Sequence, residues 1–261
     1  PHDAILLANN EILVSCYDSP FLKVIDPISS SQRTIDLSMF ADPDGIPELD
    51  HLLLLNDRIF VSAQLLDRAN QFAPTTKPLL IVLDASTLEV LDTDPSAPGT
   101  QAWVLPCHDP YTRLRSTSDG HIILACVGNF TNPDETAILR IDPSTGATTT
   151  LADYDQLGGY PSALVKFRNE SLASLVYVPS PGNSFEALEM RVVKITDSET
   201  ETIYTNAGFS LAGLGIDSQD NLYWGQRTTD DFAGIYRLNS HTQEIEGPWT
   251  TTLPPIDFLF Y

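Results

Sequence analysis

The chain has 261 residues, of which 42% are hydrophobic, so it is long enough to bury the core of one large domain. It carries 35 Asp and Glu against 14 Lys and Arg, a formal net charge of -21 at pH 7. Such a charge repels a phosphate backbone, which excludes nucleic acid from the expected partners. No apolar run approaches the roughly 20 residues needed to cross a bilayer, and we therefore expect no transmembrane segment.

One unit recurs along the chain, and its period predicts a β-propeller. Each unit has an apolar strand, a tight polar turn, a second apolar strand, a loop of variable length and a third strand ending in a polar turn. A fourth, outer strand is weaker, as expected for a short and half-exposed element. The predicted four-stranded blades cover residues 2–38, 49–104, 108–153, 160–205 and 209–251. The sequence thus predicts an all-β fold in which 1–261 is a single propeller domain with little helix.

The later strands of each unit have the clearest patterns. Second strands are predicted at 11–17, 58–64, 121–129, 171–178 and 221–227. Third strands are predicted at 23–27, 81–85, 140–143, 193–197 and 236–240. Outer strands are predicted at 32–37, 89–92, 147–152, 201–204 and 243–246.

The last residues, 253–261, have the pattern of the first strand of a further blade. The chain begins directly at a first strand, His2 to Ala8, and offers no outer strand to close that blade. Propellers commonly close by pairing strands from the two termini, which removes open sheet edges. We therefore expect further blade sequence before residue 1.

Several segments resemble bacterial YncE-like cell-surface propellers, a family rich in predicted lipoproteins. The resemblance is specific at residues 42–48 and 64–74, extends to Pro1-His2-Asp3, and is generic in the strands. It implies a seven-bladed whole, of which five blades and one strand are present here, with a signal peptide and a possible lipid anchor in the missing N-terminal sequence. The chain departs from the family at Cys16, where a basic residue is expected, and at residues 107–110, which replace an Asn-Pro pair. The resemblance assigns no catalytic residue.

Loop length predicts a binding face. Turns after first and third strands are tight, whereas the other connections are long, at 39–49, 64–77, 93–101, 129–135, 179–186 and 228–233. In a propeller these long connections emerge on one face, around the channel mouth. Because binding residues concentrate on loops held by a rigid scaffold, this face is expected to contact a protein or small-molecule partner.

Two groups of residues are candidate metal ligands. The acidic loop with Asp42, Asp44 and Glu48 offers oxygen ligands of the kind that Ca²⁺ prefers, although it also reads as an ordinary acidic turn. His2, His51 and His108 begin the first strands of three blades, each beside an Asp. Equivalent blade positions point to a common axis, so these imidazoles could hold a transition metal. The alternative is that each His pairs with the adjoining Asp or with backbone.

A second candidate site consists of polar, basic and aromatic residues: Gln64, Asp67, Arg68, Arg113, Trp224 and Arg227. A basic, aromatic channel favours an anionic or sugar-like ligand. The alternative is that Arg68 pairs with one of the many carboxylates and that Trp224 packs between blades.

Cysteine usage and catalytic motifs are less informative. Three cysteines leave at least one unpaired, and Cys16 and Cys126 lie in apolar strand patterns typical of buried thiols. Residues 208–213 resemble a nucleophile elbow but are one residue too long. We therefore expect a non-enzymatic, extracytoplasmic recognition protein, at the cell surface or in the periplasm. The alternatives are a metal-dependent hydrolase of the lactonase or esterase type, with an axial ion, and a structural component of a surface assembly.

Overall fold

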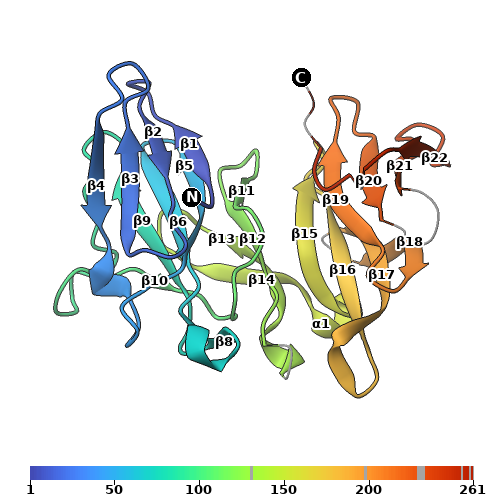
Figure 1. Ribbon diagram of the computed structural model, residues 1–261, viewed down its shortest axis with the longest axis horizontal. Coiled ribbons are helices and arrows are strands. Elements are labelled where there is room, and N and C mark those ends of the chain that lie inside the picture. The colour runs from blue at the N-terminus through green and yellow to red at the C-terminus, as the bar shows by residue number, and fades with distance from the viewer. Residues whose placement is uncertain (130–131, 197–198, 228–232, 254, 259, 261) are drawn as a thin grey trace. The chain divides into compact units, whose positions relative to one another are not determined.

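The computed structural model describes residues 1–129, 132–196, 199–227, 233–253, 255–258 and 260. It contains five antiparallel sheets of four strands each and one two-stranded ribbon (Figure 1). Most sheets run as simple meanders, with hydrogen-bonded order β1-β2-β3-β4 in the first. The predicted all-β class and its four-stranded units are confirmed.

The strands follow the chain in order. The first sheet has β1 (Ala4–Leu6), β2 (Ile12–Val14), β3 (Phe21–Ile25) and β4 (Gln32–Asp36). The second has β5 (Leu49–Leu55), β6 (Arg58–Ala63), β9 (Leu79–Asp84) and β10 (Trp103–Val104), with the ribbon β7 (Leu66–Asp67) and β8 (Ala73–Pro74) between β6 and β9. The third has β11 (Arg115–Ser116), β12 (Ile122–Cys126), β13 (Ala137–Ile141) and β14 (Thr148–Asp153).

The remaining sheets are longer. The fourth has β15 (Tyr160–Lys166), β16 (Leu172–Ser180), β17 (Asn183–Ile195) and β18 (Thr200–Ala207). The fifth has β19 (Leu211–Ile216), β20 (Leu222–Gln226), β21 (Ala233–Leu238) and β22 (Ile245–Thr251). Helix is confined to α1 (Tyr154–Leu157) and the short 3₁₀ turns η1 (Ser38–Phe40), η2 (Arg68–Asn70) and η3 (Pro133–Glu135). None of the helices in the described ranges has the length and apolar character of a membrane span.

The chain divides into two compact units. Unit 1 comprises Pro1–Asn129 with Leu139–Thr149, and unit 2 comprises Phe130–Ile138 with Thr150–Tyr261. The first two sheets belong wholly to unit 1 and the last two to unit 2. Each unit is described by itself below.

The outer strand of the second sheet differs from the prediction. It was expected at 89–92, where Val90 bridges Leu83 and the Leu91 N–H donates to the Val82 oxygen, but the strand β10 lies later, at Trp103–Val104, and also pairs with β9. The ring of Trp103 stacks on Phe60 with 6.1 Å between centroids. Residues 89–91 and β10 therefore pair with successive stretches of β9, and the stacking of Trp103 on Phe60 accompanies the second.

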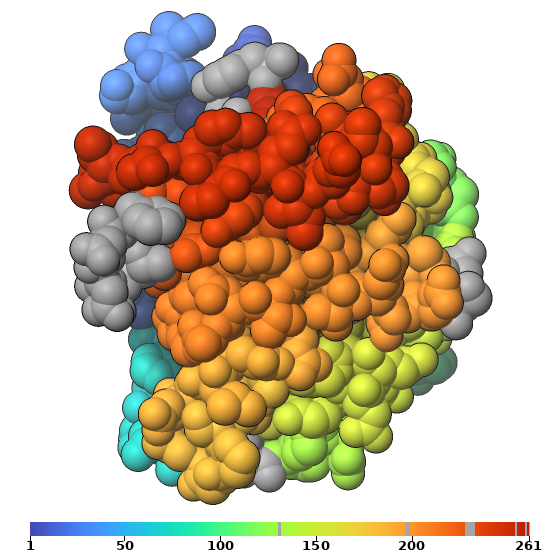
Figure 2. All heavy atoms as spheres, turned by 90° about the vertical axis from the view of Figure 1, so that its right-hand side faces the viewer, coloured from blue at the N-terminus to red at the C-terminus, as the bar shows by residue number. Residues whose placement is uncertain are grey.

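The C-terminal residues also differ from the prediction. The described residues of 253–261 form no strand; positions 254, 259 and 261 lie outside the described part. Phe258 and Pro255 lie directly against Gly215 and Gly225 of the fifth sheet, where any side chain would collide with them. Figure 2 shows the red atoms of these last residues and β22 as a continuous band on the surface of unit 2. Glycine therefore makes this sheet flat enough for an extended segment to lie on it.

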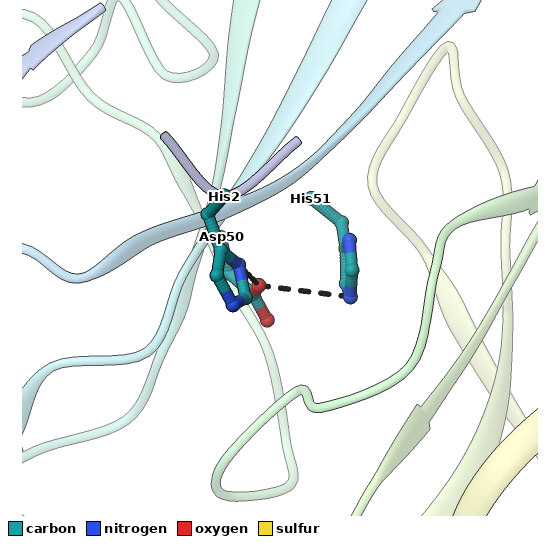
Figure 3. A group of neighbouring side chains, drawn as sticks. All are labelled: His2, Asp50 and His51. Atoms are coloured by element: carbon teal, nitrogen blue, oxygen red, sulfur yellow. Dashed lines mark ion pairs between the residues drawn. The ribbon is translucent and has the colours of Figure 1, made fainter. Parts of the chain in front are cut away.

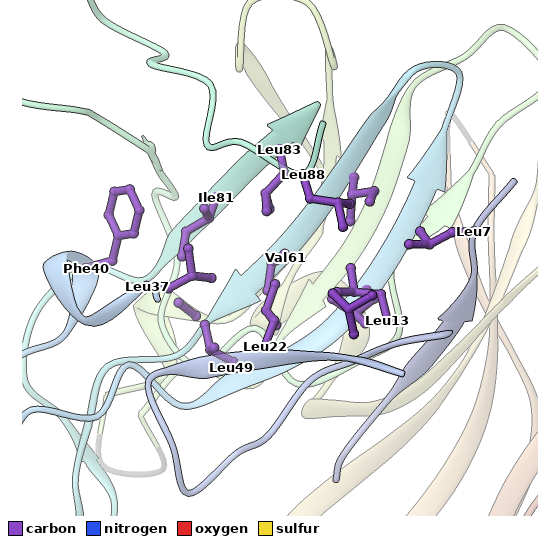
Figure 4. Packing of buried hydrophobic residues seen from close by; sticks show 14 residues of the cluster. Leu7, Leu13, Leu22, Leu37, Phe40, Leu49, Val61, Ile81, Leu83 and Leu88 are labelled. Carbon is purple, nitrogen blue, oxygen red and sulfur yellow. The ribbon is translucent and has the colours of Figure 1, made fainter. Parts of the chain in front are cut away.

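The core of unit 1 follows the period of two expected for strands. Alternate residues of β3, β6 and β9 point inward, and the buried cluster joins the first and second sheets (Figure 4). Leu22 on β3 lies in this cluster with no exposed surface, whereas Ile28, in the turn after β3, is 90% exposed.

This contrast gives a matched test of the core. Leu22→Ala should lower the free energy of unfolding by about 2–5 kcal/mol, because it removes buried methyl groups and leaves a cavity. Ile28→Ala deletes a similar side chain from the surface and should change it by less than about 0.5 kcal/mol. Urea unfolding followed by circular dichroism measures both. Equal effects of the two substitutions would contradict this account of the core.

The cysteines differ from the prediction that Cys126 is a buried thiol. Cys126, the last residue of β12, forms a disulfide with Cys107, while Cys16 is free and buried. The two bonded residues are 19 positions apart with Cα atoms 6.0 Å from each other. Pro110 forms an isolated bridge with Cys126, so backbone pairing brings the segment after Cys107 alongside β12.

The pairing can be checked by counting thiols. The denatured, unreduced chain should react with a thiol reagent at one cysteine, and the reduced chain at three. Reduction should lower the free energy of unfolding by about 3 kcal/mol, as expected for closing a loop of this length. A Cys16→Ala variant serves as the control and should show no reactive thiol before reduction. Three thiols in the unreduced wild type would refute the disulfide.

Candidate functional site

Polar residues of unit 1 converge where the segment before β1 meets the beginning of β5. His2 and Asp3 directly precede β1, and Asp50 and His51 lie at the start of β5. The strands β1 and β5, which begin consecutive sheets, are in contact. We call the group of His2, Asp50 and His51, with the residues that hold them, the Asp50 site.

The Ser15 hydroxyl joins the two sheets at this point. It is buried, donates to the backbone oxygen of Asp50 at 2.5 Å, and accepts from the backbone N–H of Asp3 at 2.9 Å. Two backbone hydrogen bonds add to this link. The N–H of His2 donates to the backbone oxygen of Ser15, and the N–H of Ser15 donates to the backbone oxygen of Asp3. One residue after β2 therefore fixes the backbone on both sides of the site.

The Asp50 carboxylate is only 1% exposed, and its two oxygens have different surroundings. Oδ2 accepts a hydrogen bond from Gln64 Nε2 at 2.8 Å, and Gln64 Oε1 accepts one from the Tyr17 hydroxyl at 2.6 Å. Oδ1 is buried and pairs with His2. It lies against His2 Nδ1 and 3.6 Å from His51 Nε2 (Figure 3).

The hydrogen bonds around Asp50 fix the roles of its neighbours. Burial, followed by the charges of nearby carboxylates, raises the pKa of Tyr17 above its usual value, so its hydroxyl remains a donor. This donor sets the orientation of the Gln64 amide, whose nitrogen is then presented to Asp50. The hydrogen bond with Asp50 is the main cause that raises the pKa of His2, and burial only partly opposes it.

Asp3 orients the second imidazole. Its Oδ2 lies 3.4 Å from His51 Nδ1 and accepts from the backbone N–H of Leu52 at 3.0 Å. Although burial acts to raise the pKa of Asp3, the hydrogen bonds from His51, Leu52 and Ala4 lower it to about 2. Asp3 is therefore ionised at neutral pH and holds His51 by one ring nitrogen, while the other faces Asp50.

A second carboxylate near Asp50 belongs to Asp109, two residues after Cys107. Burial, and then the negative charge of Asp50, raises the pKa of Asp109 to about 7. Pro110 provides a second, longer acceptor for Gln64 Nε2 at 3.4 Å. Asp109, Glu48 and Leu65 all have positive φ without being glycine, at 49°, 46° and 57°. Strained backbone of this kind persists only where the surrounding structure enforces it, as often happens at binding sites.

The positive charge of Arg68, next to the Asp50 site, is compensated by two carboxylates. Its Nε donates to the buried carboxylate of Glu48 at 2.8 Å, and a terminal nitrogen donates to Asp18 at 2.6 Å. The guanidinium also lies 5.4 Å from the centre of the Tyr17 ring. Both carboxylates compensate its charge, so Arg68 supports the loop around the Asp50 site and is not presented to an anion.

The predicted metal ligands do not all come together. His2 and His51 do, through Asp50, the aspartate that adjoins His51 in the sequence. The Nδ1 of His108 instead lies 3.5 Å from the amino group of Lys77. In the acidic loop, Asp42 accepts from the Asp44 backbone N–H and from Thr75, Asp44 accepts from Ile46, and Glu48 pairs with Arg68. In this structure the three carboxylates accept from neighbouring groups, and the predicted calcium site stays a prediction.

The remaining predicted ligand residues belong to different elements of the two units. Gln64 belongs to the Asp50 site, Asp67 caps η2 by accepting from the Ala69 N–H, and Arg113 is exposed. In unit 2, Trp224 is fully buried and its ring stacks on Tyr236. Trp224 therefore packs in the core and presents no surface to a ligand. Arg227 lies over the Phe209 ring at 4.8 Å, and residues 228–232 of the following loop lie outside the described part of the chain.

Sequence reasoning missed Ser15 and Tyr17, which support Asp50 from the first sheet. Both follow β2 and flank Cys16, so they are two residues apart and share a side of the extended chain. The alternation indicates that Ser15 and Tyr17 point to the same side. It does not indicate that Asp50 and Gln64 are the residues on that side.

Comparison with known proteins identifies the fold. No protein-family model matches this chain, and no curated protein matches it. Virginiamycin B lyase from Staphylococcus aureus is 13% identical, with a TM-score of 0.55 over 94% of this chain and 83% of the lyase. A luciferin-regenerating enzyme is 14% identical, with a TM-score of 0.57 over 98% of this chain and 80% of the enzyme.

The extracellular domain of BT4673 from B. thetaiotaomicron is a third match, 11% identical with a TM-score of 0.54. The match covers 93% of this chain, which spans about a quarter of the matched chain, 26%. Identities this low carry the fold and no activity. The matched structures are β-propeller proteins, and this chain has the β-propeller fold.

Proposed function

We propose that this protein is an extracytoplasmic β-propeller that recognises a small cationic ligand at the Asp50 site without transforming it. The observation that carries the proposal is the Asp50 carboxylate, which is buried and whose Oδ1 faces the imidazoles of both His2 and His51. A buried anion of this kind is costly unless a positive partner compensates it. His2 lies beside it and is 44% exposed, so the oxygen is close to solvent on that side.

The charges around Asp50 favour a cation. Asp3 is ionised at neutral pH, and Asp109 adds a second acidic group near Asp50. Arg68, the nearby guanidinium, is already paired with Glu48 and Asp18. The net charge of -21 on the whole chain further raises the local concentration of cations.

Recognition is favoured over hydrolysis by the way the hydroxyl groups are used. Ser15 donates to the Asp50 backbone and Tyr17 donates to Gln64, so each hydroxyl proton serves to orient another residue. A hydrolase with a side-chain nucleophile would instead leave such a hydroxyl free for its substrate, and the ester-turnover assay below tests the metal-dependent hydrolase. The network is preorganised, which lowers the entropic cost of binding.

The extracytoplasmic location is supported by the Cys107–Cys126 disulfide, because such bonds form and persist mainly in oxidising compartments. The resemblance to YncE-like propellers supports the same location at the cell surface or in the periplasm. The seven-bladed whole and the lipid anchor that this resemblance implies stay predictions.

A panel of probes tests the proposed function. The folded chain is titrated with spermidine, Zn²⁺ and Ca²⁺ as cations, trehalose as a neutral sugar and sulfate as an anion, and thermal unfolding is followed. At 100 times its dissociation constant, a bound cation should stabilise the protein by about 2.7 kcal/mol, whereas trehalose and sulfate should have no effect. Asp50→Asn, which keeps the side-chain shape, should abolish the stabilisation.

Glu89→Gln is the matched control, since it removes one exposed carboxylate from the same unit and should retain the response. Stabilisation by sulfate, or an unchanged response of Asp50→Asn to every cation, would overturn the proposed function. Turnover of a simple ester by the wild type, lost in Asp50→Asn, would favour the hydrolase alternative.

A further inference from the structure

We propose that the cation is a divalent transition-metal ion bound by His2, Asp50 and His51; this inference rests on the proposed function and names its ligand class. One possible ligand atom from each of the three residues lies within 4.8 Å of the other two. Figure 3 shows both imidazole rings beside the same end of the Asp50 side chain. Three donor atoms at such separations fit around one ion.

The three donors are the kind that a transition metal prefers. Two are imidazole nitrogens and one is a carboxylate oxygen, whereas Ca²⁺ and Mg²⁺ favour sites made almost entirely of oxygen ligands. The acidic loop with Asp42 and Asp44 has such oxygens, but they are used within the turn. The choice of ligand atoms therefore separates the Asp50 site from the calcium site that the sequence alone suggested.

The atoms that do not face the ion are already occupied. Asp50 Oδ2 accepts from Gln64, and His51 Nδ1 lies 3.4 Å from Asp3. A carboxylate on the far nitrogen of a ligating histidine fixes the ring and increases its basicity, which is the usual arrangement around protein-bound metals. Asp50 and His51 thus each have one atom held by the protein and one that faces the ion.

His2 allows the ion to enter. It precedes β1, its side chain is 44% exposed, and its ring lies 5.6 Å from that of His51 between centroids. Its Nδ1 contacts Asp50 Oδ1 directly. Metal binding replaces this contact by two bonds of about 2.0–2.2 Å to the ion, which requires a small outward movement of the exposed ring. Solvent or a bound molecule would complete the coordination.

The test uses the full chain without a histidine tag. Zn²⁺ binding is measured by isothermal titration calorimetry at pH 7.5 in excess Mg²⁺, and Co²⁺ binding by its visible absorption, which reports nitrogen and oxygen ligation. We expect one ion per chain. Asp3→Asn, which removes a residue that only orients a ligand, should weaken Zn²⁺ binding by ~10- to 100-fold. His51→Gln and His2→Gln, which each remove a ligand, should weaken it by more than ~100-fold.

His241→Gln, which removes an exposed imidazole from unit 2, is the matched control and should bind like the wild type. His2→Gln keeps the test valid if His51→Gln fails to fold, because His2 is half-exposed and outside the core. Equal Zn²⁺ affinity in His2→Gln and the wild type would overturn the metal site. If Zn²⁺ does not bind while spermidine still binds in an Asp50-dependent manner, the inference fails and the proposed function stands. If Asp50→Asn alters the response to no cation, both fail.

Discussion

The Asp50 site depends on one buried hydroxyl group. Ser15 donates to the backbone of Asp50 and accepts from that of Asp3, so a single side chain sets the spacing between the residues before β1 and the start of β5. Without it, a buried backbone oxygen and a partly buried N–H would each lose a partner, and an unpaired buried group is more costly than the loss of an average hydrogen bond. The positions of both imidazoles therefore depend on Ser15, which is not itself one of the proposed ligands.

The disulfide and the strained backbone act on the same region from the opposite side. The Cys107–Cys126 bond and the Pro110 bridge hold the segment that carries Asp109 against β12. Asp109 has positive φ, which an ordinary residue adopts only under such constraint. Asp109 is thereby kept close enough to Asp50 for the charge of Asp50 to oppose the ionisation of Asp109. The disulfide and the Pro110 bridge hold Asp109 in this position, and a bound cation would relieve the repulsion.

The strands were predictable because they depend on local patterns, whereas their exceptions depend on distant contacts. Alternating apolar residues and polar turns located β3, β6 and β9 within a few positions. The strand at Trp103–Val104 was missed because its contacts, pairing with β9 and stacking on Phe60, are with residues far earlier in the chain. Cysteine pairing was missed for the same reason, since hydrophobic strand patterns give no measure of the distance between Cys107 and Cys126.

The candidate site was predictable only where equivalent positions in the repeat remained equivalent in space. His2 and His51 each stand at the start of a first strand, and contact between β1 and β5 brings them together. His108 occupies the same place in the sequence pattern, but the strand that should follow it is shortened to Arg115–Ser116. The segment between them is instead tied to β12 by the disulfide, and His108 lies near Lys77. A repeat therefore predicts convergence only as far as the regular strand continues, and Asp50, on a full-length strand, is the residue about which the donors gather.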